Sequence, residues 1–164
     1  MDFLVLTPPV CTPSEPPSGA FVLASALCAR GYDAGILDLS LEFYCRFFDS
    51  TPWRTSTERA LKYLRTATDG YTPAQHRTEA GALHNDLRRF SKEYPGWRLT
   101  AMDIESPARV HDPQATLEML STDSDPFLSL WDETLIPSLE QFRPRVAVIS
   151  ISYLSQLTGA ISLQ

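Results

Sequence analysis

Four polar side chains that could bind a ligand accompany an apolar run near the C-terminus. Ser150, Ser152, Ser155 and Gln156 lie in and just after the run VAVISI at residues 146–151. Such a run predicts a buried parallel strand, and open α/β sheets bind ligands at the carboxyl ends of their strands. The same hydroxyls could instead cap the helix that follows. The pattern alone leaves both roles open.

The loop at residues 8–18 is the other candidate wall of that site. It follows the apolar run at residues 2–6, holds five of the chain's thirteen prolines and ends where a helical pattern begins at Gly19. Proline has a fixed φ and no backbone N–H, so this loop is poorly suited to cradling a phosphate. We expect a rigid wall of a broad ligand cleft, with residues 150–156 opposite and Cys11 as a weaker contact.

Asp38 ends a second apolar run, at residues 32–39. A carboxylate there could bind a ribose, as in nucleotide-binding folds, or cap the next helix. The sequence has no G-x-G-x-x-G fingerprint, P-loop, H-E-x-x-H or G-x-S-x-G motif. A dinucleotide-dependent dehydrogenase is therefore not expected, and we predict no catalytic residue.

The histidines and cysteines do not predict a metal site. His76 and His84 share nearly one face of a predicted helix but lack a third ligand at helical spacing, and His111 stands apart. The cysteines at positions 11, 28 and 45 are too widely spaced for a zinc or iron–sulfur site. We expect Cys28 and Cys45 to pack on helix faces.

Composition limits the partners. The 164 residues are 43% hydrophobic, carry a formal charge of -6 and show no basic cluster, so neither nucleic acid nor an anionic membrane is an expected partner. No apolar run approaches the length of a membrane span, and the N-terminus lacks the features of a signal peptide. We expect a cytoplasmic protein.

The apolar runs predict an α/β fold with a flavodoxin-like (Rossmann-like) parallel sheet. Three strands, at residues 2–6, 32–39 and 146–151, and a helix from Gly19 to about Gly31 would form residues 1–40 and 141–164. Residues 41–140 show only helical patterns and predict an all-helical insertion. Helices would start at Thr55, Thr72, Asp112 and Asp125, and Pro137 would kink or divide the last of them. A three-stranded sheet of this kind is small, so we expect a portion of a longer protein.

Two segments carry a resemblance to a known family. The stretches "LVLTPP" and "PPSGAFVLASALCARGYDAGILDLSLEFY", followed much later by "FRPRVAVISISYLSQLTGAISL", resemble the N-terminal cobalamin (B12)-binding domain of cobalamin-dependent radical SAM enzymes. The resemblance covers residues 1–48 and 138–164. It implies that cobalamin lies at the carboxyl edge of the sheet, and that a following barrel domain holds an iron–sulfur (4Fe-4S) cluster and S-adenosylmethionine. Many members are methyltransferases.

The resemblance also implies which residues contact cobalamin. These are Pro8, Pro9, Pro16, Pro17, Ser18 and Gly19 in the first turn, with Ser150, Ser152, Ser155 and Gln156 after the third strand. The D-x-H-x-x-G signature, the glycine-rich fourth-strand loop and the C-x-x-x-C-x-x-C motif of the cluster are absent. Cobalamin would lack a lower histidine ligand, and the partner for radical chemistry would be a radical SAM domain of the same chain.

Two alternatives stay open. The chain could be a non-catalytic recognition domain that has lost cobalamin and uses the insertion to bind a substrate or a partner. Exposed Trp53, Tyr71 and Trp97 would fit this alternative, but all three could instead be core residues. It could also be a generic nucleotide-binding domain that uses Asp38.

Overall fold

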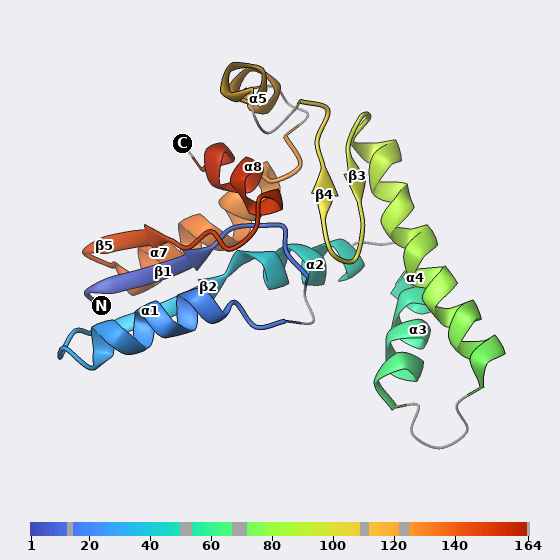
Figure 1. The fold of residues 1–164 in the computed structure, drawn as a ribbon, viewed down its shortest axis with the longest axis horizontal. Coiled ribbons are helices and arrows are strands. Elements are labelled where there is room, and N and C mark those ends of the chain that lie inside the picture. The colour runs from blue at the N-terminus through green and yellow to red at the C-terminus, as the bar shows by residue number, and fades with distance from the viewer. Residues whose placement is uncertain (13–14, 50–53, 67–71, 109–111, 122–124, 164) are drawn as a thin grey trace.

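The structure is a computed structural model that describes residues 1–12, 15–49, 54–66, 72–108, 112–121 and 125–163 (Figure 1). Its centre is a parallel sheet in the order β2-β1-β5, formed by β1 (Phe3–Thr7), β2 (Ala34–Asp38) and β5 (Val146–Ile149). Val5 of the central strand stands opposite Ile36 and Val148. This order matches the first three strands of a flavodoxin-like sheet, so the predicted α/β class is confirmed.

Both faces of β1 are covered because its side chains alternate between two apolar layers. Val5 packs against Ala20 and Ala24 of α1 (Ser18–Cys28), which runs along β1 and β2 in Figure 1. Leu4 and Leu6 face the larger core on the other side. That core continues into α2 (Leu39–Asp49) and the insertion, where aromatic side chains dominate it.

The insertion is mainly helical, as predicted. It contains α3 (Arg54–Thr66), α4 (Pro73–Glu93), α5 (Pro113–Leu120) and α6 (Leu128–Leu130). The Thr72 hydroxyl accepts a hydrogen bond from Gln75 N at 3.2 Å, and Asp112 Oδ1 accepts one from Ala115 N at 3.1 Å. These two caps confirm the predicted starts of α4 and α5.

Helices α3 and α4 lie side by side (Figure 1), and a buried hydrogen bond from Thr57 to Asp86 joins them. Thr57 Oγ1 donates to Asp86 Oδ2 at 2.8 Å, and Arg89 Nη1 donates to Asp86 Oδ1 at 3.0 Å. The buried carboxylate is therefore paired on both oxygens, as a charge in such a position requires.

The helix that contains Pro137 changes its hydrogen-bond pattern but is not divided. A π-helical segment, η1 (Trp131–Leu135), leads directly into α7 (Ile136–Phe142), which includes Pro137 near its start. Pro137 has no N–H to offer the carbonyl one turn earlier, and the π-helical segment lies in the turn before it. Of the kink or division predicted at Pro137, the division is wrong. The chain then forms β5 and α8 (Ser155–Ser162).

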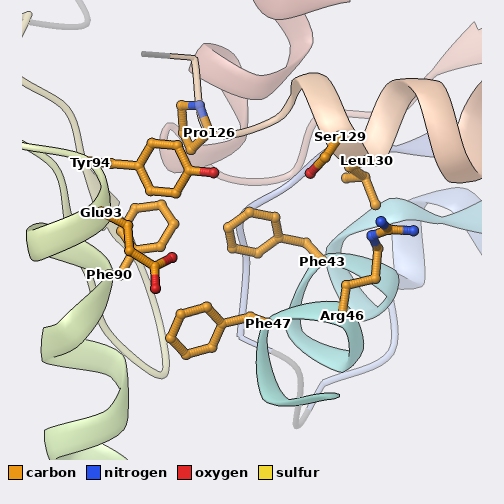
Figure 2. A pocket seen from close by; sticks show the side chains of 9 residues that line it. All are labelled: Phe43, Arg46, Phe47, Phe90, Glu93, Tyr94, Pro126, Ser129 and Leu130. Carbon is orange, nitrogen blue, oxygen red and sulfur yellow. The ribbon is translucent and has the colours of Figure 1, made fainter. Parts of the chain in front are cut away.

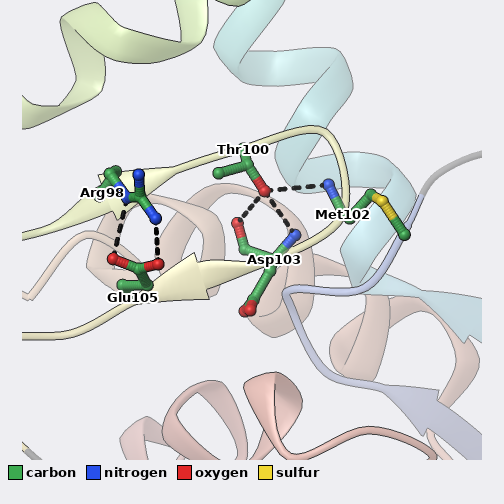
Figure 3. A network of polar contacts seen from close by, with 5 residues as sticks. All are labelled: Arg98, Thr100, Met102, Asp103 and Glu105. Atoms are coloured by element: carbon green, nitrogen blue, oxygen red, sulfur yellow. Dashed lines mark hydrogen bonds and ion pairs between the residues drawn. The ribbon is translucent and has the colours of Figure 1, made fainter.

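The insertion is not all-helical, which corrects the sequence prediction. An antiparallel hairpin of β3 (Arg98–Leu99) and β4 (Ile104–Glu105) follows α4. Arg98 and Glu105 form a cross-strand ion pair, and the Thr100 hydroxyl accepts hydrogen bonds from Met102 N and Asp103 N in the turn (Figure 3). Strands of two residues are too short to produce the alternation by which a strand is predicted.

The third strand of the sheet is less buried than its apolar sequence predicts. Val146 and Ile149 of β5 are each 44% exposed, because β5 pairs with β1 on one side and with no other described strand. An apolar run fits a strand with neighbours on both sides, but it does not reveal how many neighbours the strand has. Among the described residues, no helix is both long and apolar enough to cross a membrane.

The contribution of Asp125 to the stability of the fold is expected to depend on pH. Its Oδ1 accepts from Phe127 N at 2.8 Å and its Oδ2 accepts the Ser162 hydroxyl, which itself accepts from Trp131 Nε1 at 2.8 Å. Burial raises the pKa of the Asp125 carboxyl, so the folded protein holds this proton more tightly than the unfolded chain. The stability that this group contributes is present at pH values below its unfolded pKa, and it is lost as pH rises through the folded pKa.

Asp125→Asn keeps the acceptor for Phe127 and removes the buried charge. We expect the free energy of unfolding to rise at pH 7 and the difference from wild type to shrink at pH 4. Urea unfolding at both pH values measures this, with the exposed Asp132→Asn as control. A loss of stability at pH 7 would contradict the expectation.

Candidate functional site

The two predicted walls meet at the carboxyl edge of β1 and β5 (Figure 1). The Ser150 N–H donates to Leu6 O at 2.8 Å, which continues the β1–β5 ladder into the loop before α8. A Cβ built on Gly19 would lie 3.3 Å from both the Ser150 and the Ser152 hydroxyl oxygens. Segments more than 100 residues apart in sequence therefore touch at this edge. The predicted site residues near it are Pro8, Pro9, Pro16, Pro17, Ser18, Gly19, Ser150, Ser152, Ser155 and Gln156.

The serine hydroxyls at the edge are not helix caps. Helix α8 has Leu154 at its N-cap and no side-chain capping bond, and α1 likewise begins after Pro17 without one. No hydrogen bond joins the hydroxyls of Ser18, Ser150 or Ser152 to another described residue. Of the two roles that the sequence left open, capping is wrong. These hydroxyls remain able to bind a ligand.

Gln156 holds the site together and has little capacity left for a ligand. Its side chain is only 1% exposed. The amide Oε1 accepts from Ser152 N at 2.8 Å and Tyr153 N at 3.1 Å, and Nε2 donates to Pro8 O at 2.9 Å. The resemblance implies a cofactor contact at this position, but the structure gives the amide a positioning role between the two loops.

The prolines divide into two pairs. Pro8 and Pro9 are buried under α8, where Gly159 approaches so closely that a Cβ on it would lie 2.2 Å from Pro9 O. Pro16 is exposed and Pro17 half-buried, so this pair borders the open side of the edge. The inner prolines therefore set the position of α8, and the outer ones can touch a ligand.

Glu15 and Tyr153 belong to the site but were missed by sequence reasoning. Tyr153 OH donates to Glu15 Oε2 at 3.0 Å, which links the proline loop to the loop before α8. This hydrogen bond and the negative charge raise the pKa of Tyr153. The available signal was that Glu15 is the only charged residue in the loop at residues 8–18.

The crevice between the two walls is small. Its volume is about 20 Å³, and it is lined by Cys11, Glu15, Pro16, Pro17, Ser18, Ser152, Tyr153 and Gln156. A space of this size holds about one water molecule. A larger ligand would have to lie across the edge of the sheet instead of entering it.

Cys11 is fixed below this crevice. Its N–H donates to Ser40 Oγ at 2.9 Å, and the Ser40 hydroxyl donates back to Cys11 O at 3.1 Å. Burial raises the pKa of the Cys11 thiol above its usual value, so the thiol stays neutral and unreactive. Its position supports a packing role at the start of α2.

Asp38 caps α2. Its Oδ1 accepts hydrogen bonds from Ser40 N and Leu41 N, both at 3.1 Å. An open cleft of about 490 Å³ lies beside it, lined by Glu15, Pro16, Pro17, Phe21, Ile36, Asp38 and Leu41. Two carboxylates and no basic residue line this cleft, which disfavours a nucleotide phosphate. The capping role that the sequence offered for Asp38 is therefore confirmed, through its Oδ1.

Thr7, at the end of β1, carries a buried hydroxyl without a hydrogen-bond partner among the described residues. It is 1% exposed and, by strand alternation, lies on the α1 side of the sheet with Val5. A buried polar group normally forms a hydrogen bond. At the carboxyl end of the sheet, the Thr7 hydroxyl therefore has hydrogen-bonding capacity that the described residues do not satisfy.

The remaining sequence candidates lie elsewhere. His76 and His84 are exposed on α4, and no group of three metal-ligating side chains occurs in the described part of the chain. Trp97 is 1% exposed and packs edge-on against Phe127, so of the two placements that the sequence left open for it, the core is confirmed. His111, Trp53 and Tyr71 lie outside the described residues.

In comparisons with protein-family models, curated proteins and solved structures, the chain has no match.

Proposed function

We propose that the carboxyl edge of the three-stranded sheet binds cobalamin. The observation that carries the proposal is the set of uncommitted hydroxyls from both walls, Ser18 on one side and Ser150 and Ser152 on the other. They gather at neighbouring parallel strands, in the two segments that resemble cobalamin-binding domains. Hydroxyl groups that donate and accept suit the amide-rich periphery of a corrin ring.

The residues fit a cofactor that lies on the edge. Gly19 leaves the Ser150 and Ser152 hydroxyls uncovered where any side chain would crowd them. The exposed side chains of Ile151, Tyr153 and Leu154 add an apolar surface beside these hydroxyls. The crevice of about 20 Å³ is too small to admit a corrin, so the cofactor would rest against its mouth.

The chain's own contribution would be to bind and orient the cofactor and to shield it from water. When bound, cobalamin would supply methyl-group transfer or tune a substrate radical. The segments that form this edge contain no histidine, so they offer no imidazole to the cobalt. In this proposal a radical SAM domain of the same protein binds the iron–sulfur cluster and S-adenosylmethionine.

A cytoplasmic location is part of the proposal. Cys11, Cys28 and Cys45 are all free thiols, as is usual in a reducing compartment. Fractionation of the source cells with an antibody against the protein tests this, since recovery outside the cytoplasm would overturn it.

The Ser150→Ala/Ser152→Ala double variant tests the proposed site. We expect hydroxocobalamin to bind about tenfold more weakly, because two hydrogen bonds of roughly 0.5–1.5 kcal/mol each are lost, while the far-UV spectrum and unfolding midpoint stay unchanged. Ser25→Ala, on the exposed middle of α1, is the matched control and should bind as wild type does.

Equal binding by the double variant and wild type would place cobalamin elsewhere. If neither binds it, the alternative of a recognition domain that has lost cobalamin is favoured. That alternative no longer draws support from Trp97, which lies in the core.

A further inference from the structure

A third hollow, apart from the crevice and the cleft described above, lies between α2 and the insertion helices. It has a volume of about 180 Å³ and opens between α2, α4 and the start of α6 (Figure 2). Figure 2 shows Phe43, Arg46 and Phe47 entering from α2 and Phe90, Glu93 and Tyr94 from α4 and its C-terminal end. The remaining lining residues are Pro126, Ser129 and Leu130.

Four aromatic rings form the floor and walls of this cavity. Phe43 and Phe90 are 6% and 2% exposed, with their ring centroids 5.9 Å apart. Phe47 and Tyr94 flank them, with centroids 6.0 Å and 4.8 Å from that of Phe90. Each ring has a negative π face, so a cavity walled by several of them is favourable for a positive charge.

The charged side chains around the cavity also favour a positively charged ligand. Glu93 is exposed at the rim, and no side chain in the described ranges forms an ion pair with it. Arg46, on the opposite wall, is engaged by Glu133 and lies 3.4 Å from Thr134 Oγ1. Burial raises the pKa of the Tyr94 hydroxyl, and the carboxylates of Glu93 and Asp125 raise it further. Of the two charged residues that line the cavity, Arg46 is therefore paired with a carboxylate and Glu93 has no described ion-pair partner.

We propose that this cavity binds an organic cation, an ammonium or guanidinium group carried on a short apolar stem. The stem would contact the rings of Phe43 and Phe90, and the cation would lie among the aromatic walls within reach of Glu93. The volume suits a group of a few heavy atoms and is too small for a nucleotide. The cation could belong to a free alkylamine or to an arginine side chain of a peptide. This proposal does not depend on cobalamin binding.

Backbone-amide NMR titration of the 164-residue protein tests the proposal with two cations. They are n-butylammonium, a free amine, and N-acetyl-arginine amide, which presents a peptide side chain. The neutral comparison compounds are n-butanol and N-acetyl-citrulline amide. We expect at least one cation to bind about tenfold more tightly than its neutral counterpart, with shifts confined to α2, α4 and residues 126–130.

Two variants locate the binding determinants. Glu93→Gln should weaken cation binding about fivefold, and the fold should be retained because Glu93 is exposed. Phe47→Leu should weaken it by a similar factor while keeping an apolar wall. The exposed Glu140→Gln on α7 is the control and should leave binding unchanged.

The pattern of binding identifies the source of the cation. Binding of n-butylammonium alone indicates a free amine, and binding of N-acetyl-arginine amide alone indicates a peptide side chain. Equal affinity for a cation and its neutral counterpart, or no binding of either cation, would overturn the proposal. Unchanged cation binding by Glu93→Gln and Phe47→Leu would also overturn it.

Discussion

Gly159→Ala should destabilise the protein by about 3 kcal/mol, one of the two largest effects that we expect from a single substitution. The new Cβ would lie 2.2 Å from Pro9 O and 3.0 Å from Pro9 Cγ. The nearest atom is a backbone carbonyl oxygen in a buried loop, so it cannot swing aside as a flexible side chain could. Helix α8 would have to move away from the proline loop and stretch the hydrogen bond from Gln156 to Pro8.

Gly81→Ala is the matched control for this substitution. Gly81 lies within α4, and a Cβ on it would have no atom within 4 Å. We expect this change to stabilise the protein by about 0.5–1 kcal/mol, because alanine favours a helix over glycine. Urea unfolding followed by circular dichroism measures both changes. Effects of the same sign at the two positions would contradict the close approach of α8 to Pro9.

Gln156→Met is expected to cost about 2–4 kcal/mol. Methionine has a similar length and occupies the same space, but it leaves Pro8 O, Ser152 N and Tyr153 N without their partner. A buried backbone group deprived of its hydrogen bond costs about 1–3 kcal/mol, and the two N–H groups near the surface regain part of this from water. Equilibrium unfolding in urea gives the free energy directly.

Two further variants separate hydrogen bonding from packing at this position. Gln141→Met changes an exposed glutamine on α7 and should have an effect below about 0.5 kcal/mol. Gln156→Glu keeps the acceptors but can donate to Pro8 O only when protonated, so we expect its stability to recover toward wild type as pH falls. A Gln156→Met protein as stable as wild type would show that the amide does not hold the two loops together.

Local signals were sufficient for much of the fold. Thr72 and Asp112 mark helix starts because a short polar side chain next to proline offers the backbone a cap, and both caps are formed. The run at residues 2–6 becomes the central strand because its side chains are apolar on both faces.

Other features depend on contacts between distant segments, which a single sequence does not reveal. The hairpin rests on an Arg98–Glu105 pair seven residues apart, and nothing in the composition distinguishes those residues from a solvated loop. Trp97 is buried because Phe127, 30 positions later, packs against it. β5 is exposed because of its place in the strand order, although its own sequence is that of a buried strand.

The candidate site was also predictable in part. Its location was predictable, because the carboxyl ends of neighbouring parallel strands meet at one edge. The roles within it were not, since Gln156 and the inner prolines hold the edge together while the serine hydroxyls remain uncommitted. The roles of Glu15 and Tyr153 follow only from the hydrogen bond between them, which joins positions 138 residues apart.

Equilibrium dialysis of the protein against hydroxocobalamin, read by visible absorbance on the protein side, tests the central proposal most directly. We expect saturable retention of one cobalamin per chain, undiminished in Ser25→Ala and about tenfold weaker in Ser150→Ala/Ser152→Ala. No retention by the folded wild-type protein at an excess of hydroxocobalamin would contradict the proposal that this edge of the sheet is a cobalamin site.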